Sequence, residues 1–171
     1  NKAEETAQTM TRIAEAEGDP NLLLEAHFSV GLTYYFQGHP VAAIEHLRQV
    51  IALDSLKRDR SFTYQSGQDA GVCVLTYAGL TLWQLGCLDE AREMSQKAVD
   101  LARHIKHPFS LAYALNFAGW FSQMCGNAEE ATVYSQEEID LSAKQGFFWV
   151  SLGSVIYGWA RAKQGEAKTG L

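Results

Sequence analysis

The chain has 171 residues, of which 47% are hydrophobic, so it can bury a sizeable core. Its net charge of −6 gives it no electrostatic attraction to nucleic acid or to an anionic membrane. Three cysteines without a CxxC pair, and no apolar run long enough to cross a bilayer, favour a reduced, cytoplasmic protein without a disulfide framework.

Residues 2–17 predict one amphipathic helix. Its apolar positions fall on one face: Ala7, Met10, Ile13 and Ala14. The sequence Gly18-Asp19-Pro20 ends it. By its phase within the repeat pattern, this helix is the second helix of a repeat whose first helix is missing. At the other end of the chain, residues 165–171 begin a second helix and stop. We therefore expect the chain to be a piece of a longer array that self-associates through apolar ends.

From residue 21 onward, four segments each place two glycines seven residues apart. The pairs are Gly31 and Gly38, Gly79 and Gly86, Gly119 and Gly126, and Gly158 and Gly165. The second glycines follow one another at intervals of 48, 40 and 39 residues. This rhythm predicts an array of helix pairs that bury their apolar faces against each other. We expect the first glycine to permit close helix packing and the second to end the helix in a left-handed conformation.

A second amphipathic helix follows each second glycine. In repeat one it starts at Pro40, which suits the first helical turn because its missing N–H needs no partner there. A small residue stands five positions after each second glycine, where paired helices should cross: Ala43, Ala91, Ala131 and Gly170. The predicted units are residues 21–54, 71–106, 108–145 and a partial unit over 147–171.

Residues 55–70 form a long linker that stretches the first interval. We interpret its basic cluster, Lys57-Arg58-Asp59-Arg60, as a solvated segment rather than a phosphate contact, because the cluster is short and contains an acid. Asp69 can cap the next helix by accepting hydrogen bonds from its free N–H groups. The length of the linker still makes it a candidate contact site.

These features resemble the tetratricopeptide repeat (TPR), over nearly the whole chain. The matching residues of repeat one are His27, Val30-Gly31, Tyr34, Gly38, Ala43, Leu47 and Val50, and those of repeat two are Leu75, Ala78-Gly79, Leu82, Gly86, Ala91, Ser95 and Ala98. The resemblance implies an all-α fold, a right-handed α-α superhelix of stacked antiparallel helix pairs. The period departs from the usual 34 residues, and Leu47, Ser95 and Ser135 replace the aromatic residue of the second helix.

Two segments look most like the C-terminal repeat regions of bacterial signalling proteins. They are GQDAGV (residues 67–72) and HPFSLAYALNFAGW (residues 107–120). Proteins of that group carry an ATPase module, often with a nucleotide cyclase or a transcription-activation domain. The resemblance therefore implies that the chain is a regulatory part of a larger signalling protein.

The resemblance also implies that the first helices line a concave face. Its inward positions give a groove that is aromatic and nearly uncharged: Phe28, Tyr35, Trp83, Asn116, Trp120, Gln123 and Trp159. Aromatic side chains give large contact areas at low entropic cost. We expect the groove to bind a peptide or helix, from a partner or from the parent chain's own ATPase or cyclase domain. Alternatively, the tryptophans pack between helices and meet no ligand.

Two other functions remain open: a small-molecule sensor arm of a signalling ATPase or cyclase, and a spacer or oligomerisation element. No phosphate-binding loop, zinc ligand set or nucleophile elbow occurs, so we expect no enzyme activity, no cofactor and no metal. We interpret the five histidines as surface or helix-end residues: His27, His39, His46, His104 and His107.

Overall fold

The computed structural model describes residues 2–54 and 67–166. Eight helices occupy these ranges, and no residue in them forms a strand. The helices are α1 (Lys2–Glu17), α2 (Pro20–Phe36), α3 (Pro40–Asp54), α5 (Ala70–Gln84), α6 (Leu88–Ile105), α7 (Pro108–Met124), α8 (Ala128–Gln145) and α9 (Trp149–Lys163). The basic cluster Lys57-Arg58-Asp59-Arg60 and Gly170 lie outside the described residues.

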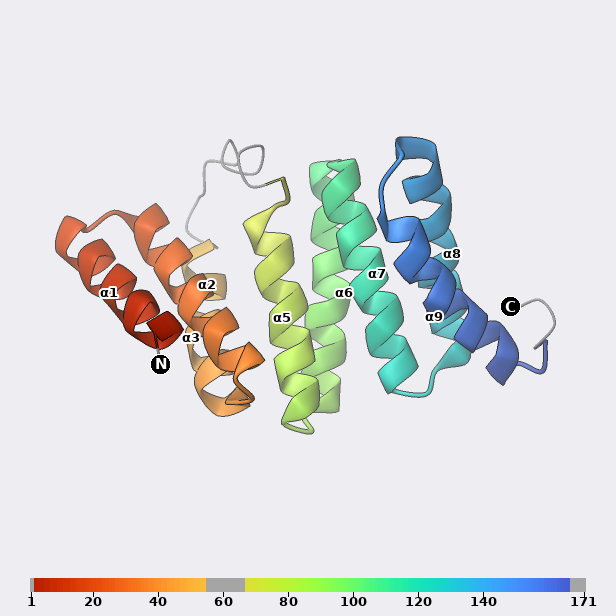
Figure 1. Cartoon of the computed structure of the whole chain (residues 1–171), viewed down its shortest axis with the longest axis horizontal. Helices are drawn as coiled ribbons and strands as arrows, with labels where there is room; N and C mark the ends of the chain where they lie inside the picture. The colour runs from red at the N-terminus through yellow and green to blue at the C-terminus, as the bar shows by residue number, and fades with distance from the viewer. Residues whose placement is uncertain (1, 55–66, 167–171) are drawn as a thin grey trace.

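The helices stack in chain order from α1 to α9 (Figure 1). The first helices of the pairs are α2, α5, α7 and α9, and each contacts the next along the row. The second helices α3, α6 and α8 lie behind them, each packed between its own first helix and the following one (Figure 1). We call the surface formed by α2, α5, α7 and α9 the first-helix face.

The repeated glycines have the two roles expected of them. A Cβ on Gly79 would lie 3.1 Å from the carbonyl oxygen of Ala91, so the missing side chain lets α5 and α6 approach closely. Gly38 and Gly86 follow the ends of α2 and α5 with φ of +75° and +79°, a region that glycine enters at little cost. The small residues of the second helices are fully buried at these crossings: Ala43, Ala91 and Ala131.

Local capping explains where the helices begin. The side chain of Asp69 accepts a hydrogen bond from the N–H of Val72 at 3.0 Å, as expected. The N–H of Asp69 in turn donates to the Ser110 hydroxyl of α7 at 2.8 Å, which ties the start of α5 to the next repeat. Pro20 and Pro108 are the first residues of α2 and α7, where the missing N–H of proline needs no partner.

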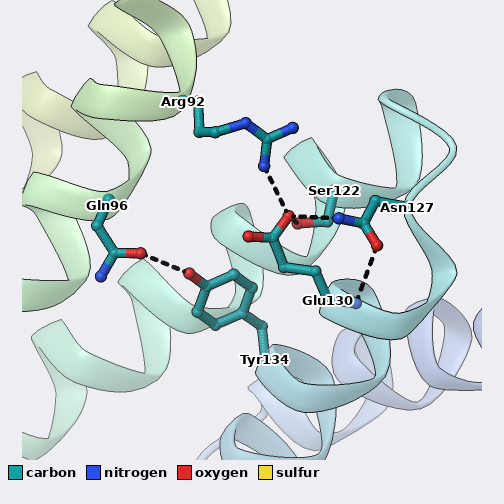
Figure 2. A network of polar contacts seen from close by, with 6 residues as sticks. All are labelled: Arg92, Gln96, Ser122, Asn127, Glu130 and Tyr134. Atoms are coloured by element: carbon teal, nitrogen blue, oxygen red, sulfur yellow. Dashed lines mark hydrogen bonds and ion pairs between the residues drawn. The ribbon is translucent and has the colours of Figure 1, made fainter. Parts of the chain in front are cut away.

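Ion pairs and hydrogen bonds join the second helices of neighbouring repeats. The best-connected group is Glu130 of α8, whose Oε2 accepts from Arg92 of α6 at 3.0 Å, Ser122 at 2.9 Å and Asn127 at 3.1 Å (Figure 2). Below it, the hydroxyl of Tyr134 donates to Gln96 of α6. These contacts fix the position of α8 relative to α6.

The buried residues form three clusters, and each cluster draws on more than one helix. One cluster includes Leu24 of α2, Leu47 of α3, Val74 of α5 and Phe121 of α7. Each repeat therefore depends on its neighbours for burial of its apolar face. Within the described ranges, no helix is long and apolar enough to span a membrane.

Candidate functional site

A row of aromatic rings crosses the first-helix face from α2 to α7. The Tyr77 ring of α5 lies 5.2 Å from Tyr35 and 5.9 Å from Phe36 of α2, measured between ring centroids. Phe117 of α7 lies 6.1 Å from Tyr77 on the other side, and Trp120 follows at 5.8 Å from Phe117. We call these five residues the aromatic row. Its two ends are exposed, with Phe36 at 71% and Trp120 at 40%.

The row ends beside a cavity between α7 and α9. The cavity has a volume of about 310 Å³. Its lining residues are Asn116, Phe117, Trp120, Gln123, Trp149, Leu152, Val155 and Ile156. Leu152 and Val155 at its rim are 45% and 68% exposed, so the cavity opens onto a surface that is itself apolar. This combination of a hollow and an apolar rim is typical of a binding site.

Two buried hydrogen-bond donors belong to the cavity wall. Asn116 is 5% exposed and Trp149 is 8% exposed. Neither Asn116 Nδ2 nor Trp149 Nε1 has a hydrogen-bond partner among the described residues. Both nitrogens have almost no accessible surface, and Asn116 lies next to the buried carboxyl group of Glu138, so neither donor opens onto the cavity.

A buried carboxyl group lies next to this wall. Glu138 of α8 is fully buried, and its Oε1 accepts from the Ser142 hydroxyl at 2.8 Å. Burial raises the pKa of Glu138, while contact with Ser142 and Asn116 partly opposes the rise. Asn116 reaches the carboxyl group without forming a hydrogen bond of ordinary geometry. Glu138 Oε2 fills the space that a side chain at Gly153 of α9 would need.

The structure distributes the residues expected in the groove over three places. Asn116, Trp120 and Gln123 come together on the cavity wall. Tyr35 belongs to the aromatic row, and Phe28 contacts the row through Tyr77 at 6.4 Å.

The two remaining tryptophans lie elsewhere. Trp83 is half-buried and packs against the core cluster that contains Leu47 and Val74. Trp159 packs against the cluster of Ala131, Ile156 and Ala160 and does not itself line the cavity.

The site residues that the sequence did not predict include Tyr77, Phe117 and Trp149. Tyr77 and Phe117 each stand two positions before the first glycine of their repeats, so their shared aromatic character was a usable signal. Trp149 gave no such signal in the sequence, because the equivalent positions of repeats two and three hold Ala70 and Ser110.

Two histidines differ from the expectation that all five lie at the surface or at helix ends. His27 of α2 and His46 of α3 are half-buried and face each other, with their Nδ1 atoms 3.0 Å apart. The Tyr34 ring stacks on His46 at 5.9 Å. Burial lowers the pKa of both histidines. In the described part of the chain, no group of three or more His, Cys, Asp or Glu residues could hold a metal ion.

Comparison with known proteins supports the architecture. Two crystal structures of a Podosopora anserina putative kinesin light chain with nearly identical TPR-like repeats match 99% of this chain and 88% of theirs. One of them, a form with a single substitution, gives a TM-score of 0.68 and the other gives 0.66, each at 15% sequence identity. The chain has a TPR-like fold. The expected all-α superhelix of stacked helix pairs is therefore confirmed.

The similarity to these structures concerns the fold alone, because a sequence identity of 15% is too low to indicate a shared function. No protein-family model matches the chain, and no curated protein matches it. Its function must therefore be argued from the site.

Proposed function

We propose that the chain binds a protein segment, either a peptide or a helix, on its first-helix face and acts as an interaction scaffold without catalytic activity. The aromatic row carries this proposal, because its rings run unbroken across three helices and end beside an apolar cavity. Stacked helical repeats commonly present such extended surfaces to partners. Aromatic anchors with an apolar rim are also the groups that dominate interface energies.

The exposed side chains set the scale of the interaction. Phe36, Trp120 and Val155 are 71%, 40% and 68% exposed, and a partner that covered them would remove apolar area from water. Full burial of one such side chain contributes about 1.5–3 kcal/mol before the cost of association is subtracted. Three such anchors contribute at most about 9 kcal/mol before that cost, so a micromolar affinity requires further contacts along the aromatic row.

The experiment selects peptides from a random displayed library and measures their affinity by calorimetry. We expect the Phe36→Ser/Trp120→Ser double variant to bind about tenfold more weakly or worse, because it removes both exposed ends of the aromatic row. The double variant leaves Trp83 unchanged, because Trp83 packs against the core and its replacement would affect stability. Circular dichroism checks that the helices persist.

The matched control is Val133→Ser, which changes an apolar residue of α8 that is 63% exposed and outside the cavity lining. We expect it to leave the affinity unchanged. Equal losses in the control and the double variant, or no loss in either, would contradict the proposal.

We also infer that this scaffold regulates a larger signalling protein, whose ATPase or cyclase domain would supply the bound segment. The support is the resemblance of residues 67–72 and 107–120 to such proteins. Sequencing the gene on both sides tests it. A Gly-x-x-x-x-Gly-Lys-Ser/Thr loop in the same reading frame would support the inference. A reading frame that encodes further repeats and nothing else would refute it.

A further inference from the structure

One face of α9 corresponds to surfaces that are buried elsewhere in the stack. In α5 and α7, the positions six and three residues before the first glycine of the repeat are at most 5% exposed, and residues of the following first helix pack against them. In α9 the same positions hold Leu152 and Val155, which are 45% and 68% exposed. Phe148, one turn earlier, is 63% exposed. We call Phe148, Leu152 and Val155 the α9 stripe, a surface on which a further first helix would pack.

A groove of matching position lies between α1 and α2. In the stack, each first helix lies against its own second helix and the following first helix: α5 against α6 and α7, and α7 against α8 and α9. Because α1 packs on α2 as α6 packs on α7, the α1–α2 groove is the place of a first helix, and no described helix fills it. The groove has a volume of about 440 Å³. Its lining residues are Lys2, Thr6, Ala7, Met10, Ser29 and Thr33.

The α2 residues in this groove agree with that register. Ser29 and Thr33 stand two residues before and two residues after the first glycine of repeat one, as Phe117 and Phe121 do in repeat three. Phe117 lies 6.1 Å from Tyr77 of α5, and Phe121 belongs to a core cluster with residues of α5, so both positions face the preceding first helix. Ser29 and Thr33 therefore face the open groove, and their small side chains leave room for the large ones of the α9 stripe.

The groove and the α9 stripe belong to helices of opposite charge. α1 carries four glutamates against two basic residues, Lys2 and Arg12. α9 carries Arg161 and Lys163 and no acidic residue, and Arg161 pairs with Glu166 of its own chain. An acidic helix and a basic helix attract each other and select the partner's orientation, so α9 suits the groove beside α1 better than it suits a second α9.

We propose that copies of this chain associate head to tail, with α9 of one copy inserted into the α1–α2 groove of the next. The two surfaces meet only between molecules, because α1 and α9 stand at opposite ends of the row (Figure 1). Such an interface is heterologous, and since it continues the stack of repeats, it grows into open chains of copies. It goes beyond the proposed binding of a protein segment, because no residue of the aromatic row takes part, although it covers Val155 at the cavity rim.

Sedimentation equilibrium of the 171-residue chain, over a series of protein concentrations, tests the mode of association. We expect the average mass to rise past that of a dimer without a plateau, because every added copy presents a new α9 stripe and a new groove. A mass that levels off at the dimer would indicate a symmetric contact and overturn the proposal. Monomers at every concentration would also overturn it and leave both surfaces to a different helix.

Two variants each block one of the two surfaces. Val155→Glu places a charge on the α9 stripe, and Met10→Glu places one in the groove, where Met10 is 39% exposed. We expect each variant to be monomeric alone. Their equimolar mixture should form a one-to-one dimer, because the intact groove of Val155→Glu accepts the intact α9 of Met10→Glu. A mixture that stays monomeric, or a single variant that associates like the wild type, would overturn the proposal.

The matched control is Val133→Glu, which places the same charge on α8 at a residue that is 63% exposed and outside both surfaces. We expect it to form chains like the wild type. A loss of association in this control equal to that in Val155→Glu would overturn the proposal, because any added charge would then have the same effect. Circular dichroism of all three variants checks that the helices persist.

Discussion

At the residue scale, Glu138 and Gly153 form a matched pair. A Cβ on Gly153 would overlap Oε2 of Glu138 and lie 2.8 Å from its Cδ and 3.0 Å from a side-chain carbon of Ile139, and Glu138 is fully buried. We expect Gly153→Ala to lower the free energy of unfolding by about 1–3 kcal/mol through overpacking. An ordinary Gly→Ala change inside a helix would raise it by about 1 kcal/mol. Urea unfolding measures the difference.

The control repeats the Gly153→Ala change in a Glu138→Ala background. There the space is free, so the alanine should stabilise α9 as in any helix. A cost that is the same in both backgrounds would show that the two residues do not interact.

The raised pKa of Glu138 makes stability depend on pH in a defined direction. Because burial favours the protonated form, Glu138 contributes most below the pKa of the unfolded chain, about 4.3. That contribution is lost as the pH rises through the higher pKa of the folded state. Relative to Glu138→Gln, which imitates the protonated acid, the wild type should therefore lose stability as the pH rises from 4 toward neutrality. Urea unfolding at a series of pH values checks this, and a parallel pH dependence of the two proteins would contradict it.

Glu138 also shows a position where residue type and repeat register predict different environments. It stands beside Glu137 in an amphipathic second helix, and an acidic side chain by itself favours exposure to solvent. In the structure, Glu137 forms an exposed ion pair with Arg103 at 2.6 Å, whereas Glu138 is fully buried. The repeat register separates the two acids, because Glu138 stands twelve residues after the second glycine, at the position of the buried Val50 and Ala98.

At the scale of elements, the contacts of the second helices can be compared between repeats. Glu90 and Glu130 both stand four residues after a second glycine, and each pairs with an arginine of the preceding repeat. Glu130 also accepts from Ser122 and Asn127, whereas the Arg48–Glu90 pair is more than half exposed on both sides. We expect Glu130→Ala to cost about 1–2 kcal/mol of unfolding free energy and Glu90→Ala under about 1 kcal/mol. Equal costs in thermal or urea unfolding would contradict this comparison.

The packing of α2 on α3 should weaken in acid. His27 and His46 face each other, and burial lowers the pKa of both, although Glu15 of α1 raises that of His27 and Glu45 raises that of His46. A lowered folded-state pKa means that the stability present above the unfolded pKa of about 6.5 is lost as the pH falls. The wild type should therefore lose more stability than His46→Gln between pH 7.5 and pH 5. Urea unfolding at both pH values tests this, and equal losses would refute it.

The elements themselves were largely predictable from the sequence. The helix expected over residues 2–17 is α1, and the glycine and proline signals locate most other helix ends, because those signals act through local backbone geometry. The contact between His27 and His46 was not predictable, because it joins the facing surfaces of α2 and α3 across 19 residues of chain.

At the scale of the whole molecule, the repeat period was sufficient to predict the stack of helix pairs, because each unit must bury its apolar face on the next. The binding surface was only partly predictable. Asn116, Trp120 and Gln123 share the cavity wall. Trp83 and Trp159 stand at the repeat positions of Gln123 and Trp120, but they pack against core clusters. The difference arises because α9 brings Trp149 and Leu152 against α7, an arrangement that the other repeats do not encode.

The central claim is that partners bind on the first-helix face rather than on the second helices behind it. The most direct measurement is amide hydrogen exchange, read by mass spectrometry, with and without a display-selected peptide. Our account predicts slower exchange in α2, α5, α7 and α9, strongest next to the aromatic row and the cavity, and no change on α3, α6 and α8. Protection confined to α3, α6 and α8 would contradict it.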